Sequence, residues 1–240
     1  MTRRRWIADE SSGDRAALVG AHALHLVRVL RARIGQEFDI ATAGSVRRGR
    51  ISALSADDSR VEFELGAEIA ASATSDVSVV LAIFKFDRFE WAVEKCTELG
   101  ASRIAPVITR RTEPHLAKAA EKRLERWRRL AVQASEQSRR ASVPLIDEPA
   151  KLSETLLSSI VGCRILLAES EEQVSLKQAL AAVNGSPVTL AVGPEGGWTD
   201  DELSLFSRQK WVAASLGKTV LRAETAAIAA LSVVMSEIEG

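Results

Sequence analysis

The sequence predicts a parallel α/β domain over residues 73–240, preceded by a small β-rich domain with one helix over residues 1–72. Three observations predict this fold class. Apolar strands alternate with amphipathic helices after residue 76, which is typical of a parallel sheet covered by helices. Before residue 66 the segments are short, alternate in polarity and end at turn residues. Small residues dominate the stretch 66–75, which is therefore a candidate linker.

The composition fits a folded protein that needs no disulfide, metal or membrane anchor. Hydrophobic residues make up 46% of the 240 residues, enough to bury a sizeable core. The two cysteines, Cys96 and Cys163, form no CxxC or His/Cys cluster, so we expect reduced thiols, no bound metal and a cytoplasmic location. The N-terminus lacks the apolar segment of a signal peptide, and no apolar run reaches transmembrane length.

Charge is unevenly distributed along the chain, although the formal net charge is zero. Residues 83–141 carry six more positive than negative side chains, and residues 142–240 carry six more negative than positive ones. A basic region of this kind is typical of a surface that binds a polyanion. Arginine also outnumbers lysine by 24 to 8. This bias fits contact with RNA, and it fits equally a GC-rich genome that prefers arginine codons.

The N-terminal region contains three predicted strands and one predicted helix. The strands are expected at residues 36–41, 47–54 and 60–65, and the helix at residues 21–30. Residues 61–65 alternate between apolar and charged side chains, as a half-buried strand should. We therefore expect a small β-barrel that carries a helix.

The C-terminal region alternates between five predicted strands and five predicted helices. The strands are expected at residues 77–84, 104–108, 164–168, 188–192 and 211–214. The helices are expected at residues 88–99, 117–139, 176–182, 200–207 and 224–238. Because open parallel sheets bind ligands at the carboxyl ends of their strands, the loops that follow these strands are the candidate site.

The first candidate loop is Gly-Pro-Glu-Gly-Gly at residues 193–197, directly after a predicted strand. Its three glycines allow positive φ angles and a close approach of the backbone to a ligand. Thr199 and Glu202 follow with the spacing of a helix capping box. The loop lacks the G-x-G-x-x-G spacing of a dinucleotide-binding turn. A ligand-binding loop and a tight turn without a ligand are both consistent with the residues.

The second candidate loop, Leu-Gly-Lys-Thr-Val-Leu-Arg-Ala-Glu-Thr-Ala, spans residues 216–226. Its Gly-Lys-Thr is similar to the end of a phosphate-binding loop, but Val212 stands where that motif needs a glycine. Leu216 and Leu221, together with exposed backbone amides, suit an adenine ring. The alternative is an ordinary loop before a C-terminal core helix.

Together, these two loops resemble the RsmE family of SPOUT methyltransferases, which methylate N3 of a uridine in small-subunit (16S) ribosomal RNA. Three other segments are similar to further motifs of the family, so the resemblance covers nearly the whole chain: residues 25–31, 85–100 and 126–140. The chain departs from the family pattern at Arg139 and Phe86, where glycine is common, and at Arg110, where glutamate is frequent. None of these departures removes a group that the chemistry needs.

The resemblance implies a trefoil-knotted SPOUT methyltransferase domain that dimerises, preceded by a PUA-like β-barrel that binds RNA. It also implies a pocket for S-adenosyl-L-methionine, formed by Leu167, Gly193, Glu195, Gly196, Gly197, Leu216, Gly217, Leu221, Arg222, Glu224, Thr225 and Ala226. For Arg222 and Glu224 a structural ion pair, with each other or across a dimer, is the favoured interpretation.

The candidate catalytic residues are Arg140 and Gln137. Uridine N3 carries a proton and is a poor nucleophile, so the enzyme must stabilise negative charge on the base. We assign this task to Arg140, with Gln137 as a hydrogen-bond donor three residues earlier on the same helix face. Glu136, Glu195 and solvent are the alternative proton acceptors. The simpler interpretation of Arg140 is an ion pair with a phosphate or a carboxylate.

The expected partner is 16S ribosomal RNA or the small ribosomal subunit, bound by a homodimer. The predicted RNA contacts are basic residues of both regions: Arg3, Arg4, Arg5, Arg28, Arg31, Lys85, Arg88 and Arg111. Two other functions are consistent with the sequence. One is a non-catalytic RNA-binding or ribosome-assembly protein, and the other is a SPOUT enzyme that acts on another RNA or another base atom.

Overall fold

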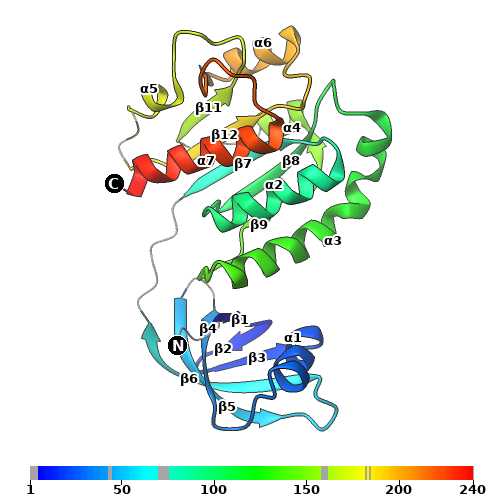
Figure 1. The fold of residues 1–240 in the computed structure, drawn as a ribbon, viewed down its shortest axis with the longest axis vertical. Helices are drawn as coiled ribbons and strands as arrows, with labels where there is room; N and C mark the ends of the chain where they lie inside the picture. The colour runs from blue at the N-terminus through cyan, green and yellow to red at the C-terminus, as the bar shows by residue number, and fades with distance from the viewer. Residues whose placement is uncertain are drawn as a thin grey trace. The chain divides into compact units, whose positions relative to one another are not determined.

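The computed structural model describes residues 5–42, 45–69, 76–157, 162–181, 183 and 185–239. Contacts between residues divide the chain into two compact units. The N-terminal unit comprises Met1–Thr74 and Ser135–Val143, and the C-terminal unit comprises Ser75–Ala134 and Pro144–Gly240. Figure 1 shows the elements of both units, with most of them labelled. The sequence predicted a single division of the chain after residue 72. In the structure, Ser135–Val143 also belong to the N-terminal unit.

The N-terminal unit is built on a six-stranded sheet with the order β1-β4-β5-β6-β3-β2. A short α-helix, α1 (Ala21–Leu24), continues into a π-helical turn, η1 (His25–Val29). The strands are β1 (Arg5–Ile7), β2 (Glu10–Ser12), β3 (Arg15–Val19), β4 (Glu37–Thr42), β5 (Ser45–Leu54) and β6 (Arg60–Ile69). Among the described residues, the edge strands β1 and β2 do not pair with each other. The sheet is therefore a half-barrel, and a closed barrel stays a prediction.

The core of the N-terminal unit is formed in part by the apolar residues that alternate with charged residues in the sequence. Along β6, the side chains of Val61, Phe63 and Leu65 are buried, while the glutamates between them are exposed. Trp6 of β1 and Leu26 of η1 belong to the same buried cluster. The three predicted strands are confirmed as β4, β5 and β6, and the predicted helix as α1 with η1. The strands β1 to β3, of three, three and five residues, were not predicted.

The C-terminal unit contains a seven-stranded sheet in which all pairs are parallel, as predicted. Its main order is β10-β8-β7-β12-β11-β13, and β9 pairs with β8. The strands are β7 (Val77–Ala82), β8 (Arg103–Ile108), β9 (Leu145–Ile146), β10 (Ala150–Lys151), β11 (Cys163–Leu167), β12 (Val188–Val192) and β13 (Val212–Ala214). The central strand β12 is buried at every position, which explains why its sequence is apolar except for Thr189.

The helices of the C-terminal unit alternate with these strands along the chain. They are α2 (Phe86–Glu98), α3 (Pro114–Gln137), α4 (Leu152–Leu157), α5 (Leu176–Leu180), α6 (Asp200–Arg208) and α7 (Ala223–Glu239). All predicted strands and helices of this region are present, with bounds that differ by at most three residues. The short elements β9, β10 and α4 were missed. Within the described residues, no helix combines the length and apolar character needed to cross a bilayer.

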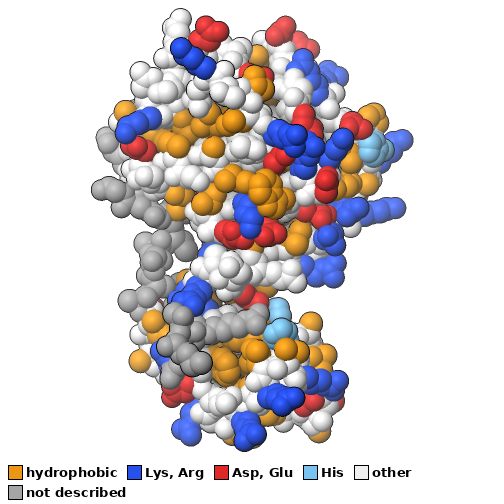
Figure 2. All heavy atoms as spheres, in the orientation of Figure 1, with side chains coloured by type: hydrophobic (Ala, Val, Ile, Leu, Met, Phe, Trp, Pro, Cys, Tyr) orange, Lys and Arg blue, Asp and Glu red, His pale blue; other side chains and the backbone are white. Residues whose placement is uncertain are grey.

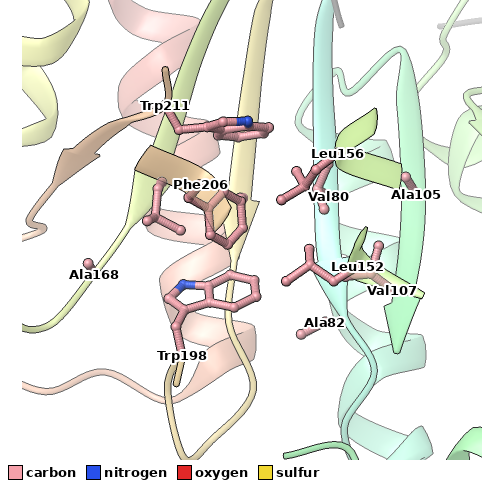
Figure 3. Packing of buried hydrophobic residues seen from close by; sticks show 12 residues of the cluster. Val80, Ala82, Ala105, Val107, Leu152, Leu156, Ala168, Trp198, Phe206 and Trp211 are labelled. Atoms are coloured by element: carbon pink, nitrogen blue, oxygen red, sulfur yellow. The ribbon is translucent and has the colours of Figure 1, made fainter. Parts of the chain in front are cut away.

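An aromatic cluster on one side of the sheet fixes the loop that follows β12. Figure 3 shows Trp198, Phe206 and Trp211 in a row that faces the aliphatic side chains of β7, β8 and α4. The ring centroids of Trp198 and Phe206 lie 4.8 Å apart, and those of Phe206 and Trp211 lie 5.1 Å apart, both edge to face. The Trp198 indole N–H also donates a hydrogen bond of 2.9 Å to the Leu167 carbonyl. The turn after β12 is therefore anchored to the end of β11.

The helix α7 packs against α2, α5 and β12. A glycine permits the contact with α2: Gly100, just after α2, has a φ of +108°. A Cβ atom at this position would lie 2.7 Å from the terminal methyl of Met235 on α7. Both the backbone angle and the close packing therefore require glycine here.

The helix α3 is fixed to α2 by Glu90, which is nearly buried. Glu90 accepts hydrogen bonds from Arg123 at 3.1 Å and from Arg126 at 2.8 Å. The ring of Phe89 packs on Trp127 with centroids 4.6 Å apart. A carboxylate bound by two arginines beside packed aromatic rings holds the two helices in a fixed register.

The end of α3 differs from the prediction. The helix stops at Gln137, because Arg139 has a left-handed φ of +58°. The amide of Arg140 donates to the Ser135 carbonyl at 2.9 Å, and the amide of Arg139 donates to the Glu136 carbonyl at 3.3 Å. These two bonds form a Schellman motif, which terminates a helix. The expectation that Gln137 and Arg140 share a helix face is therefore wrong.

Candidate cofactor-binding site

A cavity of about 450 Å³ opens in the C-terminal unit where β11, β12 and β13 end. Its position agrees with the rule that open parallel sheets bind ligands at the carboxyl ends of their strands. The cavity is lined by Arg111, Leu167, Ala168, Glu169, Ser170, Val192, Gly193, Pro194, Gly196, Gly197, Trp198, Asp200, Leu203, Ala214, Ser215, Leu216, Gly217, Lys218, Thr219, Val220, Leu221, Ala223 and Ala226.

The two loops singled out in the sequence lie on this one cavity. Among the predicted cofactor-binding residues, those that line it are Leu167, Gly193, Gly196, Gly197, Leu216, Gly217, Leu221 and Ala226. The other four, Glu195, Arg222, Glu224 and Thr225, are not part of the lining. The helix α6 and the strand β13 separate the two loops along the chain, so the fold brings distant segments to one place. Binding of a cofactor by the lining residues stays a prediction.

The three glycines of the first loop are required for different structural reasons. Gly197 has a φ of +70°, which disfavours any other residue. Gly193 and Gly196 have no such angle, but each is closely covered by a side chain. A Cβ at Gly193 would lie 3.1 Å from the Trp198 ring, and a Cβ at Gly196 would lie 3.0 Å from Cδ of Arg111. The loop is thus packed between two side chains of its own unit.

The first loop leads into α6 through the predicted capping box, which is confirmed. The amide of Glu202 donates to Oγ1 of Thr199, and the Thr199 amide donates to Oε2 of Glu202 at 2.9 Å. The buried carboxylate has a further partner, because the amide of Arg110 donates to its Oε1 at 2.8 Å. Glu202 therefore connects the start of α6 to the turn that follows β8.

This turn, residues 109–112, is fixed from inside by two buried threonines. Oγ1 of Thr112 accepts a hydrogen bond from the Thr109 amide at 3.1 Å and donates one to the Ile83 carbonyl at 3.1 Å. The hydroxyls of Thr109 and Thr112 lie 3.0 Å apart. Arg111 at the tip of the turn lines the cavity. Arg111 was predicted to contact RNA, although its place directly after a strand end was a signal for the cavity.

Arg88 of α2 lies between the two loops. Its Nη1 is 3.7 Å from Oε1 of Glu195 in the first loop, and its Nε is 3.8 Å from Oε1 of Glu224 at the start of α7. The Glu224 side chain is only 6% exposed, and its Oε2 has no hydrogen-bond partner among the described residues. The predicted RNA contact Arg88 thus faces two carboxylates at the edge of the cavity.

The cavity offers two kinds of surface to a ligand. Leu167, Leu216 and Leu221 provide apolar area for a flat ring. The charged lining residues are of both signs, with Glu169 and Asp200 against Arg111 and Lys218. A ligand with an aromatic group and both positive and negative charges matches this lining.

The candidate catalytic residues belong to the N-terminal unit. Gln137 is exposed, and Arg140 is half-buried. Burial lowers the pKa of the Arg140 guanidinium. Glu136 is buried, and its Oε1 lies 4.0 Å from Nε2 of His22. None of these residues lines the cavity of the C-terminal unit.

The other predicted RNA contacts have varied surroundings. The Arg5 guanidinium donates to the carbonyl of Arg139, and Arg28 pairs with Asp58 at 3.1 Å. Arg31 and Lys85 are exposed. Arg3 and Arg4 lie outside the described residues. On the face drawn in Figure 2, positive side chains are interspersed with negative ones.

No group of three or more His, Cys, Asp or Glu side chains in the described part of the chain is arranged to hold a metal ion. Cys96 is fully buried, and burial raises the pKa of its thiol to about 12. Its thiolate is therefore not accessible as a nucleophile near neutral pH.

Comparisons with known proteins agree with the fold. A family model described as an RNA methyltransferase domain matches residues 71–235. The chain is 31% identical over 245 residues to ribosomal RNA small subunit methyltransferase E of Synechocystis sp., with 100% of this chain and 79% of that protein covered. It is 29% identical to the protein of the same name from Bacillus subtilis, with 93% and 90% covered.

A solved structure of a protein with the same name as these relatives is also similar to this chain. The crystal structure of a ribosomal RNA small subunit methyltransferase E from Neisseria gonorrhoeae, bound to S-adenosyl methionine, has a TM-score of 0.83 to this chain. The two sequences are 27% identical, and 98% of each chain is covered. The fold is thus that of the RNA methyltransferase class. Within that class, the chain belongs to the ribosomal RNA small subunit methyltransferase E family, as the sequence motifs indicated.

Proposed function

We propose that this protein transfers the methyl group of S-adenosylmethionine to N3 of a uridine in 16S ribosomal RNA. One observation carries the proposal. The two loops that carry the family motifs, residues 193–197 and 216–226, come together on one cavity at the carboxyl edge of a parallel sheet. The related Neisseria gonorrhoeae protein is bound to S-adenosyl methionine, and the relatives' shared name specifies ribosomal RNA of the small subunit as the substrate.

The cavity fits this cofactor in size and in chemistry. Its volume of about 450 Å³ lies within the range of about 300–1,000 Å³ that is common for small-molecule sites. Leu216 and Leu221 suit the faces of the adenine ring, and the glycines of residues 193–197 let backbone amides approach the ribose. When bound, the cofactor supplies an activated methyl group on a sulfonium, so the residues of the chain need only position the base and stabilise charge.

Arg140 stabilises the negative charge of the uracil base after the loss of its N3 proton, and Gln137 donates a hydrogen bond to the base edge. Two observations support Arg140. It is half-buried, with its pKa lowered by burial, and a partly desolvated cation interacts more strongly with an anion than an exposed one does. Arginine stays charged and cannot accept the proton. Glu136, Glu195 and solvent remain the alternative acceptors.

The resemblance to the family supports further parts of the proposal. The C-terminal unit forms a trefoil knot, in which the chain after β13 passes through a loop of the same unit. Residues 1–72 form a PUA-like domain that binds RNA through Arg3, Arg4, Arg5, Arg28 and Arg31. The protein acts as a homodimer in the cytoplasm, where ribosomal subunits are assembled.

A methyl-transfer assay tests the function. The purified chain is incubated with S-adenosylmethionine labelled in the methyl group and with small ribosomal subunits, and the RNA is digested to nucleosides. We expect label in N3-methyluridine. Binding of RNA without labelled product, at saturating cofactor, would favour a non-catalytic assembly protein. Label in another nucleoside would favour a related enzyme with a different target.

A further inference from the structure

Arg111 is a positive charge on the cavity without an anionic partner among the residues that the structure describes. Its guanidinium makes no hydrogen bond or ion pair with any other described residue. The contrast with Arg88 is clear, because that arginine lies within 4 Å of Glu195 and Glu224. A cation that faces a cavity and has no protein counter-charge is suited to an anionic group of the ligand.

The backbone that carries Arg111 is held in place before any ligand binds. Thr109 and Thr112 fix the turn to the end of β7 through the Ile83 carbonyl. On the other side, the amide of Arg110 donates to the buried carboxylate of Glu202 at 2.8 Å. A turn fixed on both sides of Arg111 limits the backbone entropy lost when the exposed side chain binds a ligand.

The side chain of Arg111 lies over the first loop. A Cβ at Gly196 would meet Cδ of Arg111 at 3.0 Å, and a Cβ at Gly197 would meet its Nη1 at 3.7 Å. The guanidinium is thus placed beside the backbone of the loop that carries the family motif. This position is on the wall of the cavity, which it shares with the carboxylates of Glu169 and Asp200.

We propose that Arg111 binds the α-carboxylate of S-adenosylmethionine, an inference that rests on the proposed cofactor site. The cofactor joins an adenosine to an amino acid that carries one carboxylate, one ammonium group and a sulfonium. Leu216 and Leu221 suit the first part, and Glu169 and Asp200 supply negative charge for the two cationic groups. Arg111 supplies the planar fork that matches a carboxylate. Lys218, the other basic lining residue, belongs to the second loop beside the leucines.

Two ligands and two variants test this assignment in the full chain. S-adenosylhomocysteine keeps the carboxylate, whereas 5′-methylthioadenosine keeps the adenosine and the sulfur but lacks the amino-acid part. Calorimetry measures both dissociation constants for the wild type, for Arg111→Met and for the matched control Arg110→Met. Arg110 is exposed, lies in the same turn and is not part of the lining, so the control removes the same charge outside the cavity.

We expect Arg111→Met to raise the Kd of S-adenosylhomocysteine about tenfold or more and to change that of 5′-methylthioadenosine less than about twofold. Arg111→Lys, which keeps the charge but not the fork, gives an intermediate value. Arg110→Met behaves as the wild type with both ligands. Equal melting temperatures of the unliganded proteins show that the turn is intact.

Three outcomes would overturn the proposal. Equal weakening of both ligands by Arg111→Met would mean that the side chain only shapes the cavity. Unchanged S-adenosylhomocysteine binding with weaker RNA binding would assign Arg111 to RNA. If the wild type bound neither ligand, the proposed cofactor site itself would fail, which differs from failure of Arg111 alone.

Discussion

At the scale of single residues, Arg139 occupies a position that its side chain does not favour. Its φ of +58° lies in the left-handed region, and it stands at the residue after the helix cap where a Schellman motif usually has glycine. The family pattern has glycine at this position. The left-handed backbone after α3 therefore explains why glycine is favoured at this position and makes Arg139 an energetically costly departure.

Arg139→Gly should stabilise the protein. The left-handed conformation costs a residue with a Cβ about 1–2 kcal/mol, and the greater freedom of glycine in the unfolded chain offsets part of this gain. We expect a net increase of about 0.5–1 kcal/mol in the free energy of unfolding, measured by urea denaturation. Arg139→Ala is the control, because it removes the same side chain but keeps the backbone cost. Equal effects of the two variants would argue against this explanation.

Arg140→Ala should slow the chemical step. Removal of one group that stabilises developing negative charge typically lowers the rate about a hundredfold or more. The measurement is a single-turnover assay with saturating RNA and cofactor, so that binding does not limit the rate. Arg139→Ala, an adjacent arginine whose side chain is exposed, controls for the loss of charge. A rate near that of the wild type would remove Arg140 from the catalytic residues.

At the scale of elements, the cavity depends on turns that are tied to one another. Glu202 connects the start of α6 to the turn after β8, and Trp198 connects the first loop to β11. The capping box was predictable from Thr199 and Glu202, because both partners lie within four residues. The bond to Arg110 was not, since its partner is 92 residues away in the chain.

Glu202→Gln should loosen this connection. The side chain keeps its size, but its amide group cannot accept hydrogen bonds at both positions now served by the carboxylate. A buried amide donor left without a partner costs about 1–3 kcal/mol, so we expect a loss of that order in the free energy of unfolding, measured by denaturant titration. Asp201→Asn removes the same charge from the same helical turn at an exposed position and should have little effect. Equal losses would point to the helix dipole instead.

At the scale of the whole molecule, the sequence patterns predicted the main strands of the parallel sheet, but not the shortest strands or the partners of the basic side chains near the cavity. Strands such as β12 were predictable because five consecutive buried residues, all apolar except Thr189, stand out in the sequence. The two-residue strands β9 and β10 leave no such pattern. Arg88 and Arg111 were predicted to contact RNA, because the sequence does not reveal which group a basic side chain will contact in the folded protein. Only the fold places one beside Glu195 and Glu224 and the other on the cavity.

The central claim concerns one modified nucleotide, and cells provide its most direct test. Ribosomal RNA is isolated from cells with the gene, without it and with the gene restored, and N3-methyluridine is mapped in the 16S RNA by mass spectrometry. The account predicts one N3-methyluridine that disappears without the gene and returns with the wild-type protein. A 16S RNA with unchanged N3-methyluridine in cells that lack the gene would contradict it.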